Sequence, residues 1–196
     1  LTVNKGDYLV IAGPSGSGKT TLLNLLGALD VPSKGKILFQ QTDLAVKSRK
    51  ELSEFRLKNL GFIFQAYNLI PVLTAIENIE FSMMLSGIPE SERREKALNL
   101  MNELSIKELA HKRPNEMSGG QQQRVAVARA IVNDPAVVLA DEPTANLDSE
   151  TGSVLLDLME KMNREKSITF IFSSHDKQVI DRAKKLLILK DGKIEE

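Results

Sequence analysis

The chain has 196 residues, of which 42% are hydrophobic and 27% charged, and its 26 basic residues balance 26 acidic ones. This is the composition of an ordinary globular domain that can bury a core. The zero net charge provides no overall field to attract nucleic acid, and the lack of cysteine excludes disulfides, thiolate catalysis and cysteine metal sites. No apolar run approaches the roughly 18 residues of a membrane span. The chain opens with Leu1, close to its first core strand, and we expect the domain to begin upstream.

The first third of the chain has the pattern of alternating strands and helices. A short apolar run at residues 8–12 predicts a buried strand, and residues 20–29 predict a helix after a glycine-rich turn. Strands are also expected at residues 36–39 and 61–64, with a polar helix at residues 49–58 between them.

The middle third changes to helical periodicity, and strands return after it. Residues 73–133 are expected to form an inserted α-helical subdomain, in which Pro89 starts a charged helix. The remaining predicted elements are a helix at 118–132, strands at 136–140, 168–172 and 186–190, and helices at 149–163 and 176–184. Apolar strands alternating with helices predict an α/β fold with a mostly parallel core sheet flanked by helices, built from residues 1–72 and 134–196.

The first strand leads into GPSGSGKT at residues 13–20, which fits the phosphate-loop pattern G-x-x-x-x-G-K-[ST] between a strand and a helix. Glycines let backbone N–H groups turn inward around an anion at the positive end of the helix. Lys19 can reach the β- and γ-phosphates of a nucleotide, and Thr20 can offer its hydroxyl to Mg²⁺. Preferring this to a flexible Gly/Ser turn, we predict nucleotide contacts at Gly13, Pro14, Ser15, Gly16, Ser17, Gly18, Lys19, Thr20 and Thr21.

Two adjacent carboxylates, Asp141 and Glu142, end the apolar strand that begins at residue 136. In a neighbouring parallel strand, Asp141 would lie across the phosphate loop and reach Mg²⁺ directly or through water. Glu142 would accept a proton from the attacking water as a general base. Acidic residues also commonly begin loops after strands, but the phosphate loop favours the catalytic interpretation.

Gln65 and His175 each follow an apolar strand. Both are expected at the carboxyl edge of the sheet, where ligands of open α/β folds bind. Taken alone, each is more often a solvated loop residue. The shared edge favours them over His111, which we interpret as a surface residue.

The stretch MSGGQQQR at residues 117–124 opens the last helix of the middle third. Ser118 can cap that helix, and Gly119 and Gly120 would let a phosphate approach its backbone N–H groups. Residues 13–20 already surround the phosphates of one nucleotide. The second anion site is therefore explained by two copies about a two-fold axis, each helix start facing the nucleotide of the other copy. An ordinary polar loop with a helix cap is the alternative.

In order and spacing, these motifs resemble the nucleotide-binding domain of ATP-binding cassette (ABC) transporters over essentially the whole chain. The matching stretches are GPSGSGKT at 13–20, Gln65, MSGGQQQR at 117–124, VVLADEP at 137–143, NLD at 146–148 and His175. The resemblance implies a P-loop NTPase fold and an ATPase whose two copies close head to tail on two ATP molecules with Mg²⁺.

The same resemblance assigns roles to individual residues. Glu142 is the implied base, His175 holds the γ-phosphate, and Gln65 senses Mg²⁺ and water. The implied metal contacts are Thr20, Gln65 and Asp141. The implied contacts across the ATP-bound homodimer are Ser118, Gly119, Gly120, Gln121 and Asp148.

A narrower resemblance, in residues 27–32, 64–71 and 73–78, is to the subgroup that includes the lipoprotein-releasing and macrolide-export ATPases. It implies integral membrane transporter subunits as partners, a peripheral place on the cytoplasmic face of the inner membrane, and no nucleic acid. The alternative is a soluble ABC ATPase acting on DNA or ribosomes, which neutral charge and a single cassette weaken. A P-loop kinase would leave residues 117–124 and Asp148 unexplained.

Overall fold

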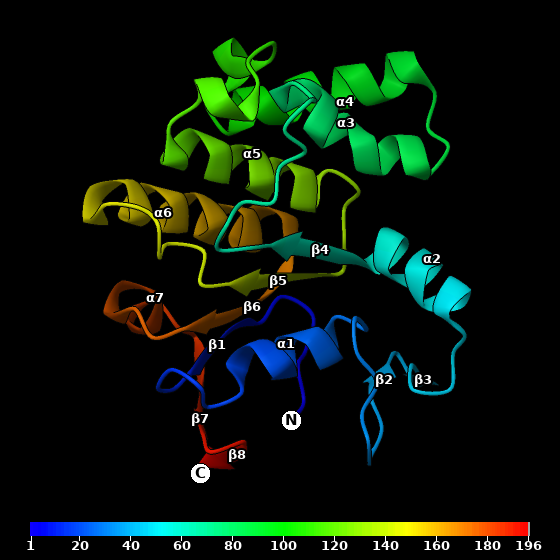
Figure 1. Cartoon of the computed structure of the whole chain (residues 1–196), viewed down its shortest axis with the longest axis vertical. Coiled ribbons are helices and arrows are strands. Elements are labelled where there is room, and N and C mark those ends of the chain that lie inside the picture. Colours follow the sequence, from blue (N-terminus) through cyan, green and yellow to red (C-terminus); the bar gives the residue numbers. More distant parts are fainter. Residues whose placement is uncertain (196) are drawn as a thin grey trace.

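A mostly parallel six-stranded sheet forms the centre of the computed structural model, which describes residues 1–195 (Figure 1). Its spatial order is β4-β5-β6-β1-β7-β8, and only β7 and β8 pair antiparallel. The strands are β1 (Tyr8–Ala12), β4 (Leu60–Ile63), β5 (Val137–Asp141), β6 (Thr169–Ser174), β7 (Lys185–Lys190) and β8 (Lys193–Glu195). A separate hairpin joins β2 (Leu38–Phe39) and β3 (Thr42–Asp43). The predicted α/β fold with a parallel core sheet is confirmed.

Helices cover both faces of the sheet and gather beyond one of its sides. They are α1 (Lys19–Leu26), α2 (Arg49–Asn59), α3 (Ala75–Leu85), α4 (Glu90–Glu103), α5 (Gly119–Ile131), α6 (Ser149–Lys166) and α7 (Lys177–Asp181), with 3₁₀ turns η1 (Lys107–Leu109) and η2 (Pro114–Glu116). In Figure 1, α3 and α4 lie at one end of the molecule, with α5 and α6 between them and the strands. That residues 73–133 form a separate subdomain stays a proposal. Helix α5, at the end of this segment, shares one hydrophobic core with the sheet. Within residues 1–195, no helix combines the length and apolar character needed to cross a membrane.

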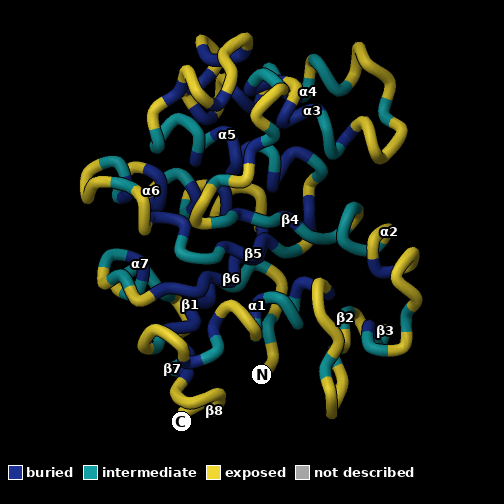
Figure 2. Tube along the Cα trace, in the orientation of Figure 1, coloured by how far each residue is buried: buried dark blue, intermediate teal, exposed yellow. Residues whose placement is uncertain are grey.

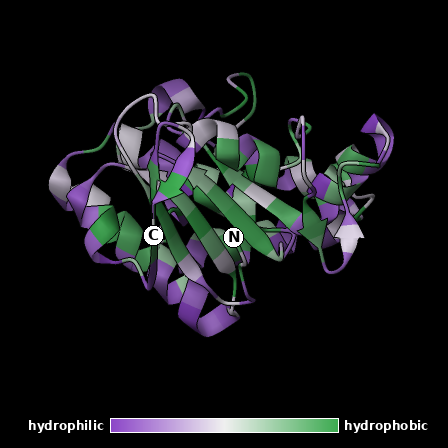
Figure 3. Ribbon diagram, turned by 90° about the horizontal axis from the view of Figure 1, so that it is seen from below, coloured by the Kyte–Doolittle hydropathy of each residue, from purple (hydrophilic) through white to green (hydrophobic). Residues whose placement is uncertain are grey.

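Side-chain alternation along the strands divides the core into two layers, one on each face of the sheet. Tyr8 and Phe172 belong to the larger layer, which also contains the buried residues of α5 and α6. Leu9 and Ile11 belong to the other layer, which contains Leu23 of α1. The strands accordingly form the buried, apolar centre in Figures 2 and 3. Helices α1 and α5 therefore cover opposite faces of the sheet, a placement that decides the architecture of the site.

Some elements differ from the sequence predictions. The helix expected to run to Leu29 ends at Leu26, because Ala28 adopts a φ of 52° and the N–H groups of Ala28 and Leu29 turn back to the carbonyls of Leu25 and Asn24. The helix expected at residues 176–184 is shorter, at Lys177–Asp181. Strands β3 and β8 were not predicted, since their two and three residues are almost all exposed and show no apolar alternation.

Close packing of α5 on β4 generates a stability prediction. A Cβ at Gly61 would stand 2.2 Å from the backbone oxygen of Ala130, which has no rotamer with which to move away. We expect Gly61→Ala to lower the free energy of unfolding by about 2–3 kcal/mol, measured by urea denaturation. Gly152→Ala is the matched control, because its Cβ would meet Thr144 Cγ2 at an ordinary 3.5 Å inside α6. Equal losses in both variants would contradict the close approach.

Candidate active site

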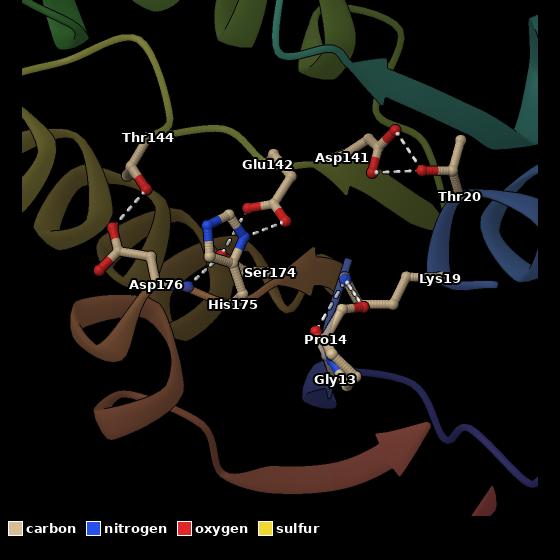
Figure 4. A network of polar contacts seen from close by, with 10 residues as sticks. All are labelled: Gly13, Pro14, Lys19, Thr20, Asp141, Glu142, Thr144, Ser174, His175 and Asp176. Carbon is tan, nitrogen blue, oxygen red and sulfur yellow. Dashed lines mark hydrogen bonds and ion pairs between the residues drawn. The ribbon is translucent and has the colours of Figure 1, made fainter. Parts of the chain in front are cut away.

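Four of the predicted site segments meet at one edge of the sheet. Strands β1, β5 and β6 run parallel, as do β4 and β5, so their carboxyl ends lie together. The phosphate loop follows β1, Gln65 follows β4, Asp141 ends β5 with Glu142 directly after it, and His175 follows β6. Figure 4 shows most of these side chains around the phosphate loop.

The phosphate loop is held in a shape that only glycine permits at two positions. A Cβ at Gly13 would lie 2.1 Å from the carbonyl oxygen of Leu189, and Gly18 enters α1 with a φ of 100°. The Gly192 N–H, in the turn between β7 and β8, donates to the carbonyl of Ser17 at 3.0 Å and supports the loop from below. The loop is therefore a pre-formed cradle at the positive end of α1.

The Lys19 side chain lies across this cradle. It is 7% exposed, and its Nζ donates to the carbonyl oxygens of Gly13 at 2.8 Å and Pro14 at 3.0 Å. These are oxygen acceptors on the loop itself, so the ammonium is already placed where phosphate oxygens would compete for its protons. The arrangement suits an anionic ligand.

Thr20 and Asp141 supply the oxygen atoms that a hard cation requires. The Thr20 hydroxyl donates to the Asp141 carboxylate, with oxygen separations of 3.1 and 3.3 Å. Mg²⁺ in nucleotide sites is bound by one or two protein oxygens together with phosphate oxygens and water. The pair therefore fits Mg²⁺ beside a phosphate held in the cradle.

Glu142 has an uncommon backbone conformation and a fixed carboxylate. Its φ is 45°, in the left-handed region that costs energy for a residue with a Cβ. Its N–H donates to the Ser173 carbonyl at 2.9 Å, and its carboxylate accepts from Ser174 Oγ at 3.0 Å and lies 2.7 Å from His175 Nδ1. An ionised Glu142 carboxylate would be the acceptor of this contact, with His175 Nδ1 as the donor. The Glu142 side chain is 14% exposed and that of His175 70%, so the imidazole projects outward from the carboxylate.

Further polar side chains hold this pair in place. The Thr144 hydroxyl donates to Asp176 at 2.8 Å, and the Asp176 N–H donates to Ser174 Oγ at 3.1 Å. Asp176 also caps α7 by accepting from the Gln178 N–H. Our sequence predictions missed Thr144, Ser174 and Asp176. The only signal for Ser174 and Asp176 was a polar Ser-Ser-His-Asp run at the end of an apolar strand, and Thr144 had no distinctive pattern.

Gln65 lies at the same edge, on a loop that is fixed by its backbone. Its carbonyl accepts from the Asn146 side chain at 2.9 Å. The next residues, Tyr67 and Asn68, have φ values of 61° and 49°, and their carbonyls accept from Arg129 of α5 at 2.9 and 2.6 Å. Burial lowers the pKa of the Arg129 guanidinium from its ordinary value. The loop that presents Gln65 therefore depends on α5.

The predicted second anion site is a capped helix start. Ser118 Oγ accepts from the Gln121 N–H at 3.3 Å, and the Gln121 side chain accepts from the Ser118 N–H at 3.0 Å. A Cβ at Gly119 would lie 2.6 Å from the Tyr67 hydroxyl, and one at Gly120 would lie 2.4 Å from Thr151 Cγ2. Both glycines thus permit close packing within the chain, as well as leaving the helix start open to an anion.

Asp148 caps α6 beside this helix start. Its carboxylate accepts from the Thr151 hydroxyl at 2.6 Å and the Thr151 N–H at 2.9 Å, and these hydrogen bonds hold the pKa of Asp148 below its usual range. Within residues 1–195, no hydrogen bond joins residues 118–121 to residues 13–21. The fold therefore brings together the phosphate loop, the two carboxylates and His175. Residues 118–121 begin α5, which covers the other face of the sheet.

Comparison with known proteins identifies relatives of this chain. A family model described as "ABC transporter" matches residues 1–145. The chain is 42% identical over 195 residues to the lipoprotein-releasing system ATP-binding protein LolD of Legionella pneumophila, covering 99% of this chain and 86% of that protein. It is 46% identical over 194 residues to the macrolide export ATP-binding/permease protein MacB of Hyphomonas neptunium, covering 99% of this chain and 30% of that protein.

A solved structure supports the same relationship. The chain superposes with a TM-score of 0.92 and 40% identity on the ATP-binding cassette MJ0796 in a dimeric post-hydrolysis state bound to ADP and Pi. The match covers 100% of this chain and 86% of that one. The MJ0796 sequence is from Methanocaldococcus jannaschii.

The position of Lys19 generates a binding prediction. We expect Lys19→Met to weaken the affinity for MgATP at least about tenfold, because a charge-assisted contact to phosphate is lost inside the cradle. Equilibrium titration with a fluorescent ATP analogue measures this. Lys50→Met, on the exposed face of α2, is the control and should bind as the unmodified chain does. Unchanged affinity for MgATP in the Lys19 variant would contradict the prediction that the phosphate loop binds the nucleotide.

Proposed function

The chain belongs to the ABC transporter family of ATPases, and on that basis we propose that it is the motor subunit of a membrane transporter. In this proposal two copies close on two ATP molecules, drive integral membrane subunits, and separate after hydrolysis. The similarity to LolD and MacB supports export, lipoprotein release or transmission of force as the driven process. Its proposed place is the cytoplasmic face of the membrane that holds those subunits.

One observation carries the proposed dimer. The phosphate loop leads into α1 and the signature residues Ser118 to Gln121 open α5, and these helices cover opposite faces of one sheet. One molecule therefore cannot wrap both around a single nucleotide without losing its core. A two-fold arrangement of two copies lets the helix start of each face the nucleotide of the other. The dimeric state described for MJ0796 supports this arrangement.

The proposed binding step uses the cradle and the oxygen pair. The backbone N–H groups of Gly13 and residues 15–18, the start of α1 and Lys19 hold the phosphates, while Thr21 extends the contact from the first turn. Thr20 and Asp141 would hold Mg²⁺, and Gln65 of the neighbouring loop would also contact it. When bound, Mg²⁺ supplies positive charge beside the phosphate oxygens.

The proposed hydrolytic step places the proton on Glu142. The oxygen of water forms a bond to the γ-phosphorus, and the bond from that phosphorus to the bridging oxygen of ADP breaks. The proton released by water passes to the Glu142 carboxylate, which Ser174 and His175 hold in position. His175 Nδ1 is engaged by Glu142, so its Nε2 is the nitrogen that can contact the γ-phosphate.

Membrane partners are favoured over DNA or ribosomes by a second observation. Val72, Met84 and Leu85 are 74%, 47% and 57% exposed in the segment that begins with Gln65 and ends with α3. We propose that this segment meets the membrane subunits, and we expect no nucleic acid to bind.

Replacing the base tests the proposed function. We expect Glu142→Gln to accumulate as a dimer with MgATP, because two copies can still close on ATP while the proton acceptor for hydrolysis is missing. Light scattering with and without MgATP measures the mass. Glu95→Gln, on the exposed face of α4, is the control and should turn over ATP without accumulating as a dimer. A Glu142→Gln protein that binds ATP but stays monomeric would contradict the proposed dimer that closes on two ATP molecules.

A further inference from the structure

The three consecutive glutamines of the signature stretch do three different things. Gln121 closes the capping box with Ser118, and Gln122 donates to the carbonyl of Met117 at 3.1 Å, so both act on the first turn of their own helix. Gln123 is fully buried, and its Nε2 donates to the carbonyl oxygen of Pro143 at 2.7 Å. This bond leaves α5 and ends at the residue directly after Glu142.

A glutamine at the buried position 123 lowers the stability of the fold. Its Oε1 is buried without a hydrogen-bond partner among residues 1–195. An unpaired buried amide oxygen destabilises a fold, and an apolar side chain of the same length would fill the space without it. What glutamine adds there is the N–H donor, so the contact with Pro143 is the feature that needs this residue.

Pro143 has a single backbone group through which it can be held. Proline has no N–H, so its carbonyl is the only hydrogen-bonding group that its own backbone offers, and Gln123 engages it. The preceding residue, Glu142, has a φ of 45°, which persists only where neighbouring contacts fix it. The bond from Gln123 therefore acts on the backbone that aims the carboxylate.

Within this turn the Ala145 N–H donates to the Glu142 carbonyl at 3.2 Å, and further contacts come from β6 and α7. The Glu142 N–H donates to the Ser173 carbonyl on β6, and the Thr144 hydroxyl donates to Asp176 at the start of α7. Both belong to the C-terminal part of the chain. Gln123 supplies the side-chain hydrogen bond that α5 makes to this turn, five positions after the Ser118 cap.

We propose that Gln123 is a positioning residue for Glu142, through which the signature helix sets the aim of the base in the same molecule. The inference rests on the proposed function, since it assigns Glu142 the role of base. When the start of α5 meets the nucleotide of the other copy, the bond to Pro143 carries the position of the helix to the Glu142 backbone. Closure of the dimer and alignment of the base are thereby linked.

The test is Gln123→Met, which keeps side-chain length and packing and removes the donor. We expect kcat for ATP hydrolysis to fall about tenfold to a hundredfold with KM for ATP unchanged, because misaimed catalytic groups slow chemistry without weakening binding. The decisive readout is the Gln123→Met/Glu142→Gln double variant, which should still dimerise with MgATP. Loss of that dimer would show that Gln123 only supports the signature helix, and would overturn the proposal.

Two comparisons keep the outcome distinct from general damage and from the proposed function. Asn163→Leu removes another buried amide, which donates to the carbonyls of Gly6 at 2.9 Å and Ile168 at 2.8 Å, away from Glu142. It should lower the thermal midpoint and leave kcat unchanged. If Glu142→Gln alone fails to dimerise, the proposed function fails. If Glu142→Gln dimerises and Gln123→Met keeps full kcat, the positioning role fails alone.

Discussion

The rest of the structure depends on the placement of α1 and α5 on opposite faces of one parallel sheet. Alternating side chains on β1 and β6 bury one layer under each helix, so neither helix can change sides without exposing a core. The helix starts are both suited to anions, yet one fold cannot bring them to the same phosphate. The composite site that we propose between two copies rests on this placement of the two helices in the core.

The edge of the sheet that carries the candidate active site shows how local strain is supported by several independent contacts. Glu142 takes a left-handed conformation, and its backbone and carboxylate are fixed from β6 by Ser173, Ser174 and His175. Arg129 fixes the similarly strained residues after Gln65 from α5. Both loops that carry site residues are thus tied to neighbouring elements. Movement of α5 relative to the sheet would be felt at both of them.

Much of the fold was predictable because its signals are local, and the segments that we propose for the site also carry local signals. Strand β1 is an unbroken apolar run. The spacing of the glycines, Lys19 and Thr20 in residues 13–20 is that of a phosphate loop. The contact between Gln123 and Pro143 was not predictable, because it joins residues brought together only by the packing of α5 against the sheet. Ser174 was missed for a similar reason, since a serine at a strand end has no distinctive pattern. The ends of short exposed elements such as β3 depend on tertiary contacts that local periodicity does not report.

The most direct test of the composite site is the mass of a Glu142→Gln/Ser118→Arg double variant in MgATP, with ATP affinity measured on the same sample. Ser118 lies at the start of α5, away from the phosphate loop of its own molecule. A bulky cation there should block the other copy and leave binding to a single molecule intact. The account predicts a monomer that binds ATP as tightly as Glu142→Gln alone. A stable MgATP-dependent dimer, or an equal loss of ATP binding, would contradict it.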